Sequence, residues 1–273
     1  MLVEICSDTD PGLARANNED SVTYDAATRL CILADGMGGH NAGEIASGMA
    51  TAFIKAELGR WIARAGAVRN AGDLEAAMAQ VIADANRAIY NMSRTTPQYS
   101  GMGTTLVVGV FRDDGLVLGH IGDSRCYRLR DGQLQQITKD HSLLQEQVDT
   151  GLVMPDQTLP PVYGNFVTRA VGVNESVHAD IARHLVMPGD LYLLCSDGLS
   201  DMVSEENVAA ILRREDAALA EKARQLIRAA NDEGGRDNIS VLLAQVREAP
   251  GKSGLLHSAR RTIHGVWQGF RRN

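Results

Sequence analysis

Aromatic side chains are scarce in this 273-residue chain: Phe, Trp and Tyr together make up only 4% of it. So few rings favour tightly packed helices over an aromatic stacking surface. No apolar run approaches the roughly 20 residues that a helix needs to cross a bilayer. The first ten residues have no basic stretch ahead of an apolar one, so a secretory signal is not expected. These absences predict a soluble cytoplasmic protein.

Cysteine is also sparse, and the spacing of the cysteines argues against a zinc or redox site. Cys6, Cys31, Cys126 and Cys195 lie far apart, and no two form the C-x-x-C spacing of a zinc or redox centre. The histidines show neither H-x-x-x-H nor H-E-x-x-H spacing, so a zinc site has no support there. Buried, reduced thiols are the prediction.

Basic residues are outnumbered and unevenly distributed. The chain has 27 Lys and Arg against 34 Asp and Glu, and its net charge is −7. Five of the basic residues, but none of the acidic ones, fall in residues 249–273, which leaves 22 basic and 34 acidic residues, a net −12, in residues 1–248. Phosphate backbones require a positive field, so nucleic acid is not expected as a partner and a metal-dependent nuclease is disfavoured. An acidic body suits a protein that gathers carboxylates around cations.

Hydrophobic patterning predicts a β-rich middle with helices on either side. The expected strands are residues 2–6, 21–24, 29–34, 104–111, 116–121, 126–129, 133–137, 191–195 and 239–246, and the expected helices are residues 45–58, 74–89, 205–214 and 217–231. Short links such as Asp131-Gly132 require antiparallel neighbours, which excludes a Rossmann or P-loop architecture. Residues from about 143 to 174 have no clear period and are predicted to be an irregular functional loop.

Several predicted strands end in an aspartate beside a glycine or serine. Asp35 and Asp197 each precede a glycine, Asp123 follows Gly122, and Asp237 lies just before the last strand. Asp-Gly pairs are common turns, but their recurrence at the ends of buried strands favours a cluster of rigidly held carboxylates. Such carboxylates repel one another unless cations offset their charge, and oxygen ligands suit Mg²⁺ or Mn²⁺. The glycine-rich stretch from Asp35 to His40 matches neither nucleotide-binding motif.

Eight short motifs, occurring in order over about residues 5–246, resemble those of the bacterial metal-dependent Ser/Thr protein phosphatases of the protein phosphatase 2C (PPM) family. The motifs are RANNED (15–20), DGMGGH (35–40), GMGTT (101–105), GDSR (122–125), TKDHS (138–142), RAVG (169–172), SDGL (196–199) and GGRDNI (234–239). The resemblance implies an α+β fold, a four-layer α-β-β-α sandwich of two antiparallel sheets packed face to face with helices outside.

The resemblance also implies a set of metal ligands for two core Mn²⁺ or Mg²⁺ ions. By similarity, Asp35 bridges both ions and the carbonyl of Gly36 joins one of them, while Asp197 and Asp237 hold the first ion. Glu19 and Asp20 serve the second, either directly or through water. Asp123, together with Asp197, resembles the ligands of a weaker third ion.

The implied reaction is the hydrolysis of phosphoserine and phosphothreonine in proteins by a hydroxide that bridges the two ions. Arg15 resembles the arginine that clamps the substrate phosphate. Met37 stands where animal members carry a histidine proposed as the general acid. His40 is then the available titratable group, either as that acid or as a hydrogen bonder that fixes its loop.

Other polar residues of the motifs are assigned structural parts. Thr104, Thr105 and Ser124 are predicted to stabilise strand ends, and Asp140 and His141 to form a buried polar pair.

The implied organisation is a catalytic domain over residues 1–248 with a flap at about 145–172 beside the active site, followed by a basic tail over residues 249–273. Phosphorylated proteins are the expected substrates, a cognate Ser/Thr kinase is the expected opposing enzyme, and a monomer is the expected acting form.

The tail has an amphipathic helical pattern that is typical of a membrane-surface or acidic-partner contact, although a helix packed on the body or an extension fits equally. A catalytically inactive phosphatase-like module that binds phosphoproteins is the alternative function, which the presence of Asp35, Asp197 and Asp237 disfavours.

Overall fold

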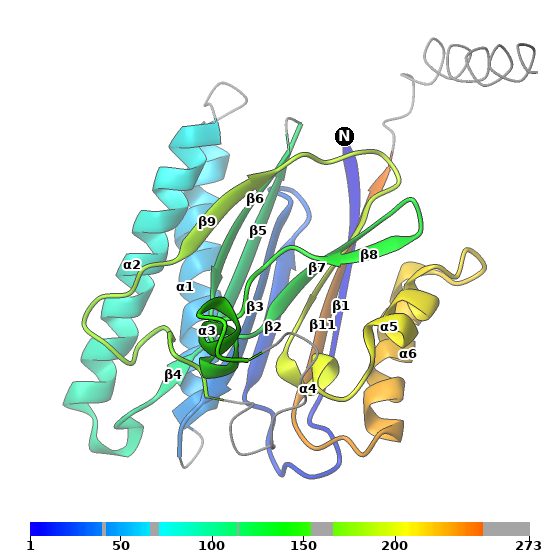
Figure 1. The fold of residues 1–273 in the computed structure, drawn as a ribbon. Coiled ribbons are helices and arrows are strands. Elements are labelled where there is room, and N and C mark those ends of the chain that lie inside the picture. The colour runs from blue at the N-terminus through cyan, green and yellow to red at the C-terminus, as the bar shows by residue number, and fades with distance from the viewer. Residues whose placement is uncertain (40–41, 66–70, 114, 154–165, 248–273) are drawn as a thin grey trace, which may run out of the picture.

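The computed structural model describes residues 1–39, 42–65, 71–113, 115–153 and 166–247. In these ranges two antiparallel sheets pack face to face, and helices cover the outer face of each sheet (Figure 1). The predicted four-layer α-β-β-α sandwich is therefore confirmed. His40, the middle of the predicted flap and the tail at 249–273 lie outside the described residues.

The first sheet contains five strands in the order β1-β11-β10-β7-β8. These are β1 (Leu2–Asp10), β11 (Ile239–Arg247), β10 (Leu191–Cys195), β7 (Arg125–Arg130) and β8 (Gln133–Gln136). Asp131 and Gly132 join β7 to β8 with φ angles of 49° and 76°, the left-handed conformation of a tight hairpin turn. The Asp-Gly hairpin prediction holds.

The second sheet has the strand order β2-β3-β5-β6-β9, with β4 paired to the end of β3. Its strands are β2 (Asp20–Asp25), β3 (Leu30–Met37), β4 (Gly103–Thr104), β5 (Leu106–Arg112), β6 (Gly115–Ile121) and β9 (Asp180–His184). In β3, Leu30 and Ile32 pack toward the helices, whereas Cys31 and Leu33 pack toward the other sheet. This two-residue alternation is why a continuous apolar run forms a strand buried on both faces.

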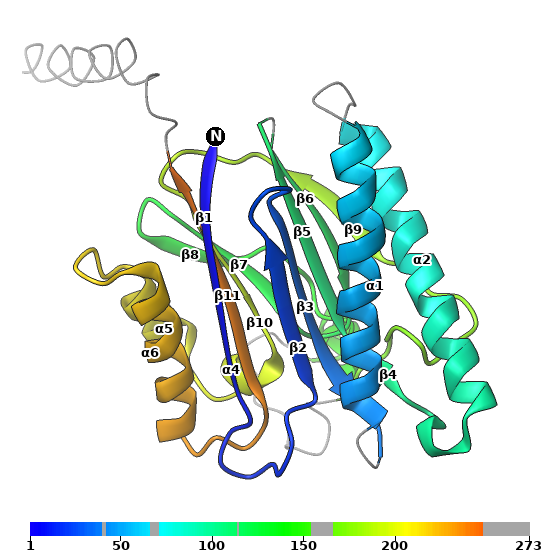
Figure 2. The same ribbon diagram turned by 180° about the vertical axis from the view of Figure 1, so that it is seen from behind.

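The helices form two separate groups on opposite sides of the sandwich (Figure 2). The long pair α1 (Ala42–Ala65) and α2 (Ala71–Thr95) covers the second sheet, and α5 (Glu205–Leu212) and α6 (Leu219–Asp232) cover the first. Shorter elements are η2 (Pro97–Tyr99), α3 (Leu143–Asp149) and α4 (Asp197–Ser200). None of the helices in the described ranges is apolar over a length sufficient to span a membrane.

Apolar side chains from both sheets fill the space between them. Phe111 of the second sheet meets Tyr192 of the first edge to face, with ring centroids 5.2 Å apart. Cys31, Cys126 and Cys195 are buried free thiols as predicted, whereas Cys6 is only half-buried.

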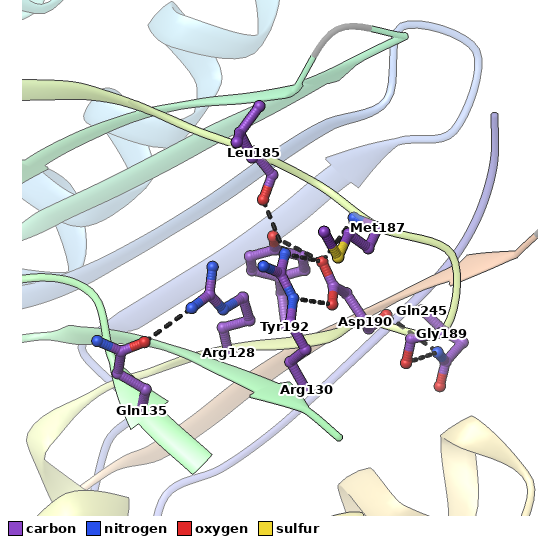
Figure 3. Close-up of polar contacts among 9 residues, drawn as sticks. All are labelled: Arg128, Arg130, Gln135, Leu185, Met187, Gly189, Asp190, Tyr192 and Gln245. Atoms are coloured by element: carbon purple, nitrogen blue, oxygen red, sulfur yellow. Dashed lines mark hydrogen bonds and ion pairs between the residues drawn. The ribbon is translucent and has the colours of Figure 1, made fainter. Parts of the chain in front are cut away.

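A buried ion pair fixes the connection from β9 to β10 (Figure 3). The carboxylate of Asp190, which is 1% exposed, accepts hydrogen bonds from Arg130 Nε at 2.7 Å and Arg130 Nη2 at 2.6 Å. The backbone N–H of Met187 donates to the same carboxylate at 2.8 Å. The Tyr192 hydroxyl also donates to Asp190, at 3.3 Å, so charged, backbone and hydroxyl donors together hold this connection.

The structure departs from the predicted elements in four places. The stretch predicted to be irregular begins with a helix, α3, whose N-terminus is capped by the Ser142 hydroxyl. Strand β9 was not predicted, and Asp197 begins the one-turn helix α4 rather than a plain turn. Strand β3 also continues through Asp35 to Met37 instead of stopping at Ala34, because Gly36 and Met37 pair with β4.

Candidate metal centre

A pocket of about 640 Å³ opens at one end of the sandwich, where strands of both sheets end. Seven residues predicted to form the site line it: Arg15, Glu19, Asp35, Gly36, Asp123, Asp197 and Asp237. Asp20 is adjacent, since its carboxylate interacts electrostatically with Asp35. Residues from five separate parts of the chain therefore meet at one place.

Asp20 and Asp35 face each other across the β2–β3 pair. They occupy directly opposite positions in the antiparallel register, so their side chains lie on the same face of the sheet. The backbone of Asp35 is fixed by Thr105, whose hydroxyl accepts from Asp35 N at 2.9 Å, and by Thr104, whose hydroxyl donates to Asp35 O at 2.8 Å. The predicted strand-end role of the two threonines is confirmed.

The first sheet brings Asp197 and Asp237 to the same pocket. Asp197 follows β10, and Asp237 precedes β11, the strand paired with β10. A Cβ atom at Gly198 would overlap the carbonyl of Asn238, so only glycine allows these two segments to approach so closely. Ser196 links the two sheets by donating to Asp20 Oδ2 at 2.8 Å.

Asn238 holds the loop that carries Arg15 and Glu19. Its side-chain amide donates to the carbonyls of Pro11 and Asn17 at 3.0 and 2.9 Å, and its Oδ1 accepts from Glu19 N at 2.7 Å. Sequence reasoning assigned no role to Asn238 or Ser196, although both lie inside motifs that carry the resemblance. The only feature of the sequence that could have indicated their roles is that each lies directly beside an expected metal ligand, Asp237 or Asp197.

Gly36 lies where the start of α1 meets the end of β3. A Cβ atom there would overlap the carbonyls of Gly43 and Glu19, and Gly43 in turn leaves room for the Glu19 carboxylate. The backbone of Gly36 donates to Glu19 O at 3.1 Å. The absence of two side chains therefore lets the acidic loop, the strand and the helix converge.

Asp123 lies in the turn between β6 and β7. Gly122 has a φ of 102° and packs against Thr105, so the turn needs a glycine before the aspartate. Ser124 and Thr105 share a hydrogen bond of 2.7 Å between their hydroxyls, which ties the turn to the strand that supports Asp35. The predicted structural role of Ser124 is confirmed.

The carboxylates of the pocket interact unfavourably with one another. Desolvation and then the charge of Asp20 raise the pKa of Asp35 well above its ordinary value. Desolvation and the charge of Asp123 raise the pKa of Asp197 to about 8, and desolvation chiefly raises the pKa values of Asp20 and Asp123 to about 6 each. Asp20 Oδ1 is buried without a hydrogen-bond partner among the described residues. Repelling, partly unpaired carboxylate oxygens are the donor set that hard divalent cations fit.

The side chains do not already form a closed metal cage. No three His, Cys, Asp or Glu side chains of the described ranges are arranged as a ready-made ion site. Arg15 donates to Asp237 Oδ2 at 2.7 Å, so one of the predicted ligands is engaged by a guanidinium. The acidic residues share a pocket, and a cation would have to draw them closer together and compete with Arg15 for Asp237.

Asp140 and His141 do not form the pair that was predicted. Asp140 accepts from Arg125 Nε and Nη2 at 2.9 and 2.7 Å, whereas His141 bonds Gly122 and Asp180. Neighbouring residues in an extended segment point in opposite directions, which explains why the two side chains find different partners.

Comparison with known proteins yields a consistent set of relatives. The Protein phosphatase 2C family model matches residues 14–244. The serine/threonine protein phosphatase PstP of Mycobacterium tuberculosis is 41% identical over 90% of this chain, and the serine/threonine phosphatase stp of Listeria monocytogenes is 37% identical over 87%. The chain spans 45% of the length of PstP and 93% of the Listeria protein.

Solved structures agree with these matches. The crystal structure of the M. tuberculosis phosphatase PstP/Ppp superposes with a TM-score of 0.80 at 40% identity, covering 91% of this chain and 100% of that one. A PstP catalytic domain in complex with two manganese ions gives a TM-score of 0.78, also at 40% identity, and covers 90% of this chain and 99% of its own.

Proposed function

This chain belongs to the protein phosphatase 2C family, and we propose that it is a metal-dependent protein phosphatase that hydrolyses phosphoserine and phosphothreonine in other proteins. The observation that carries the proposal is the pocket in which Asp35, Asp197 and Asp237 meet Arg15, the one basic side chain among the described residues that line it. A pocket lined by carboxylates and a single guanidinium suits a phosphate group that is bound through divalent cations.

We assign two Mn²⁺ or Mg²⁺ ions to the carboxylates of this pocket. Asp35 would be shared by both ions, with the carbonyl of Gly36 on one of them. Asp197 and Asp237 would complete the first site, and Glu19 and Asp20 the second, directly or through water. When bound, the ions supply an activated water and charge neutralisation at the phosphoryl group. The manganese ions in the related PstP domain support this assignment.

The chain's own residues supply the remaining parts of the reaction. The guanidinium of Arg15 is 56% exposed, and it would exchange Asp237 for a phosphate at the pocket mouth, where its paired donors match two phosphoryl oxygens. The Asn238 side chain holds the loop that presents Arg15. Asp123 would bind a third, weaker ion together with Asp197.

We propose phosphorylated proteins as substrates and a cognate Ser/Thr kinase as the opposing enzyme, with the chain acting as a monomer. Phe166 and Val167, at the end of the predicted flap, line the pocket, which supports a role for residues 145–172 in substrate access. The basic tail at 249–273 is proposed to contact an anionic membrane surface or an acidic partner; it lies beyond all the proposed ligands.

The proposal is tested by phosphate release from a phosphothreonine peptide. The full chain should be inactive in EDTA and active once Mn²⁺ is restored in excess. The Asp35→Asn variant should lose several orders of magnitude in kcat, because Asp35 is the ligand shared by both ions. Hydrolysis that persists in EDTA would exclude the metal mechanism, and binding of the peptide without hydrolysis would favour the inactive binding module.

A further inference from the structure

His141 lies between β8 and α3 and is bonded twice to the turn that carries Asp123. Its backbone N–H donates to Gly122 O at 2.8 Å, and its ring Nδ1 accepts from Gly122 N at 3.1 Å. The side chain is 3% exposed. Both backbone groups of Gly122 are thus satisfied by one residue, which fixes the turn in the left-handed conformation described above.

The hydrogen bonds determine the protonation state of this ring. Because Nδ1 accepts from Gly122, the proton resides on Nε2, which lies 3.2 Å from Asp180 Oδ2 on β9. Asp180 is held in turn by Arg169 at 2.8 Å. Burial lowers the pKa of His141, so the ring is neutral at neutral pH, as the bond from Gly122 requires.

A second histidine supports the same turn. The ring of His120 packs against that of His141 with centroids 4.6 Å apart, and it hydrogen-bonds the backbone of Ser124. The residues on both sides of Asp123 are therefore bonded to buried histidines. Asp123 itself lines the pocket.

We propose that His141 is a positioning residue that holds the Gly122–Asp123 turn so that the Asp123 carboxylate stays in the catalytic pocket. This inference rests on the proposed phosphatase function. Asp180 orients the imidazole from the opposite side, in the way that outer carboxylates orient histidines near catalytic centres. His141 touches neither the substrate nor the proposed core ligands Asp35, Asp197 and Asp237.

A double-mutant cycle tests the proposal, with kcat measured on a small aryl phosphate at saturating Mn²⁺. His141→Ala should lower kcat by about tenfold or more, the usual cost of losing an outer orienting partner, with little change in KM. Asp123→Ala should lower kcat at least as much. If His141 acts through Asp123, the double variant should be no slower than Asp123→Ala alone.

A matched control is His184→Ala. His184 lies four residues beyond Asp180 on β9, and its Nε2 has no partner among the described residues, so kcat should remain at the wild-type level. The proposal would be overturned if the losses in kcat caused by His141→Ala and Asp123→Ala multiplied in the double variant. It would also be overturned if kcat were unchanged in either single variant. A wild-type chain without Mn²⁺-dependent hydrolysis would instead refute the proposed function.

Asp180→Ala keeps the test decisive if His141→Ala fails to fold. The Asp180 side chain is 57% exposed, so its removal creates no buried cavity, yet it deprives the His141 Nε2–H of its acceptor. The Asp180→Ala substitution should also lower kcat when it is made in the wild-type chain, and it should not lower kcat further when it is added to Asp123→Ala. Thermal unfolding of each variant identifies those that are folded before kinetics are compared.

Discussion

Arg15 contacts a residue from the set of proposed metal ligands, although its assigned target is the substrate phosphate. The hydrogen bond and charge of Asp237 raise the pKa of Arg15, so the guanidinium remains a cation throughout the useful pH range. The contact leaves two possible consequences of losing this side chain, weaker phosphate binding or a displaced Asp237. Kinetics and metal binding together separate them.

Arg15→Ala should raise KM for a phosphopeptide by about 10- to 100-fold, since a charge-assisted pair of hydrogen bonds to phosphate is lost. The affinity for Mn²⁺, measured calorimetrically, should change far less. Arg15→Lys serves as the control, because it keeps the charge but loses the fork, and its KM should fall between the two. An unchanged KM with weakened Mn²⁺ binding would show that Arg15 supports Asp237 instead.

At the scale of elements, the sequence predicts most strands well, including the edge strands β2 and β8, but it misses the polar edge strand β9. The run from Leu191 to Cys195 is apolar throughout, and its predicted bounds match β10. Strand β9 contains two charged residues and a histidine among its five residues. It lies at the edge of its sheet and none of its residues is fully buried, so its sequence does not need to be apolar. A single-sequence pattern has no means of detecting such a strand.

The site was more predictable than its supports. Asp35, Asp123, Asp197 and Asp237 stand beside apolar runs, and that local pattern was enough to single them out as members of one cluster. The partners of His141 and Asn238 depend on segments that are 19 and more than 200 residues away in the chain. The pairing of β1 with β11 brings Pro11 to Asn238, and the turn after β6 meets the segment after β8 only in the folded chain. Contacts of this kind cannot be read from neighbouring residues, which is why Asp140 and His141 were paired incorrectly.

At the scale of the whole molecule, the acidic pocket should make the metal-free chain less stable as pH rises. Burial raises the pKa values of Asp20 and Asp123 to about 6 and of Asp197 to about 8, against an ordinary value of 3.8. These carboxyls bind their protons more tightly in the folded chain than in the unfolded one. Their contribution to stability is therefore full below about pH 4 and is lost as pH rises through 6 and then 8.

Thermal unfolding between pH 7 and 8.5 measures this effect without the buried His120 and His141, whose pKa values are lowered and which titrate at lower pH. Burial also raises the pKa values of Cys31, Cys126 and Cys195, so these thiols add a fall of the same sign, which the Asp197 variant separates from that of the carboxyl. The Tm of the EDTA-treated chain should fall across that range, and excess Mn²⁺ should raise it most at pH 8.5. Asp197→Asn, which removes the carboxyl with the pKa of about 8, should flatten the fall. A Tm that is constant or rises without metal would contradict the assigned repulsion.

Anomalous diffraction from crystals of the chain grown with Mn²⁺ tests the central claim most directly, namely that the carboxylates at the end of the sandwich hold the catalytic ions. Two strong manganese peaks should lie in the pocket with Asp35 as a ligand of both, Asp197 and Asp237 on one ion, and the Glu19–Asp20 segment beside the other. Peaks that lie outside the pocket, or that leave Asp35 uncoordinated, would contradict the account.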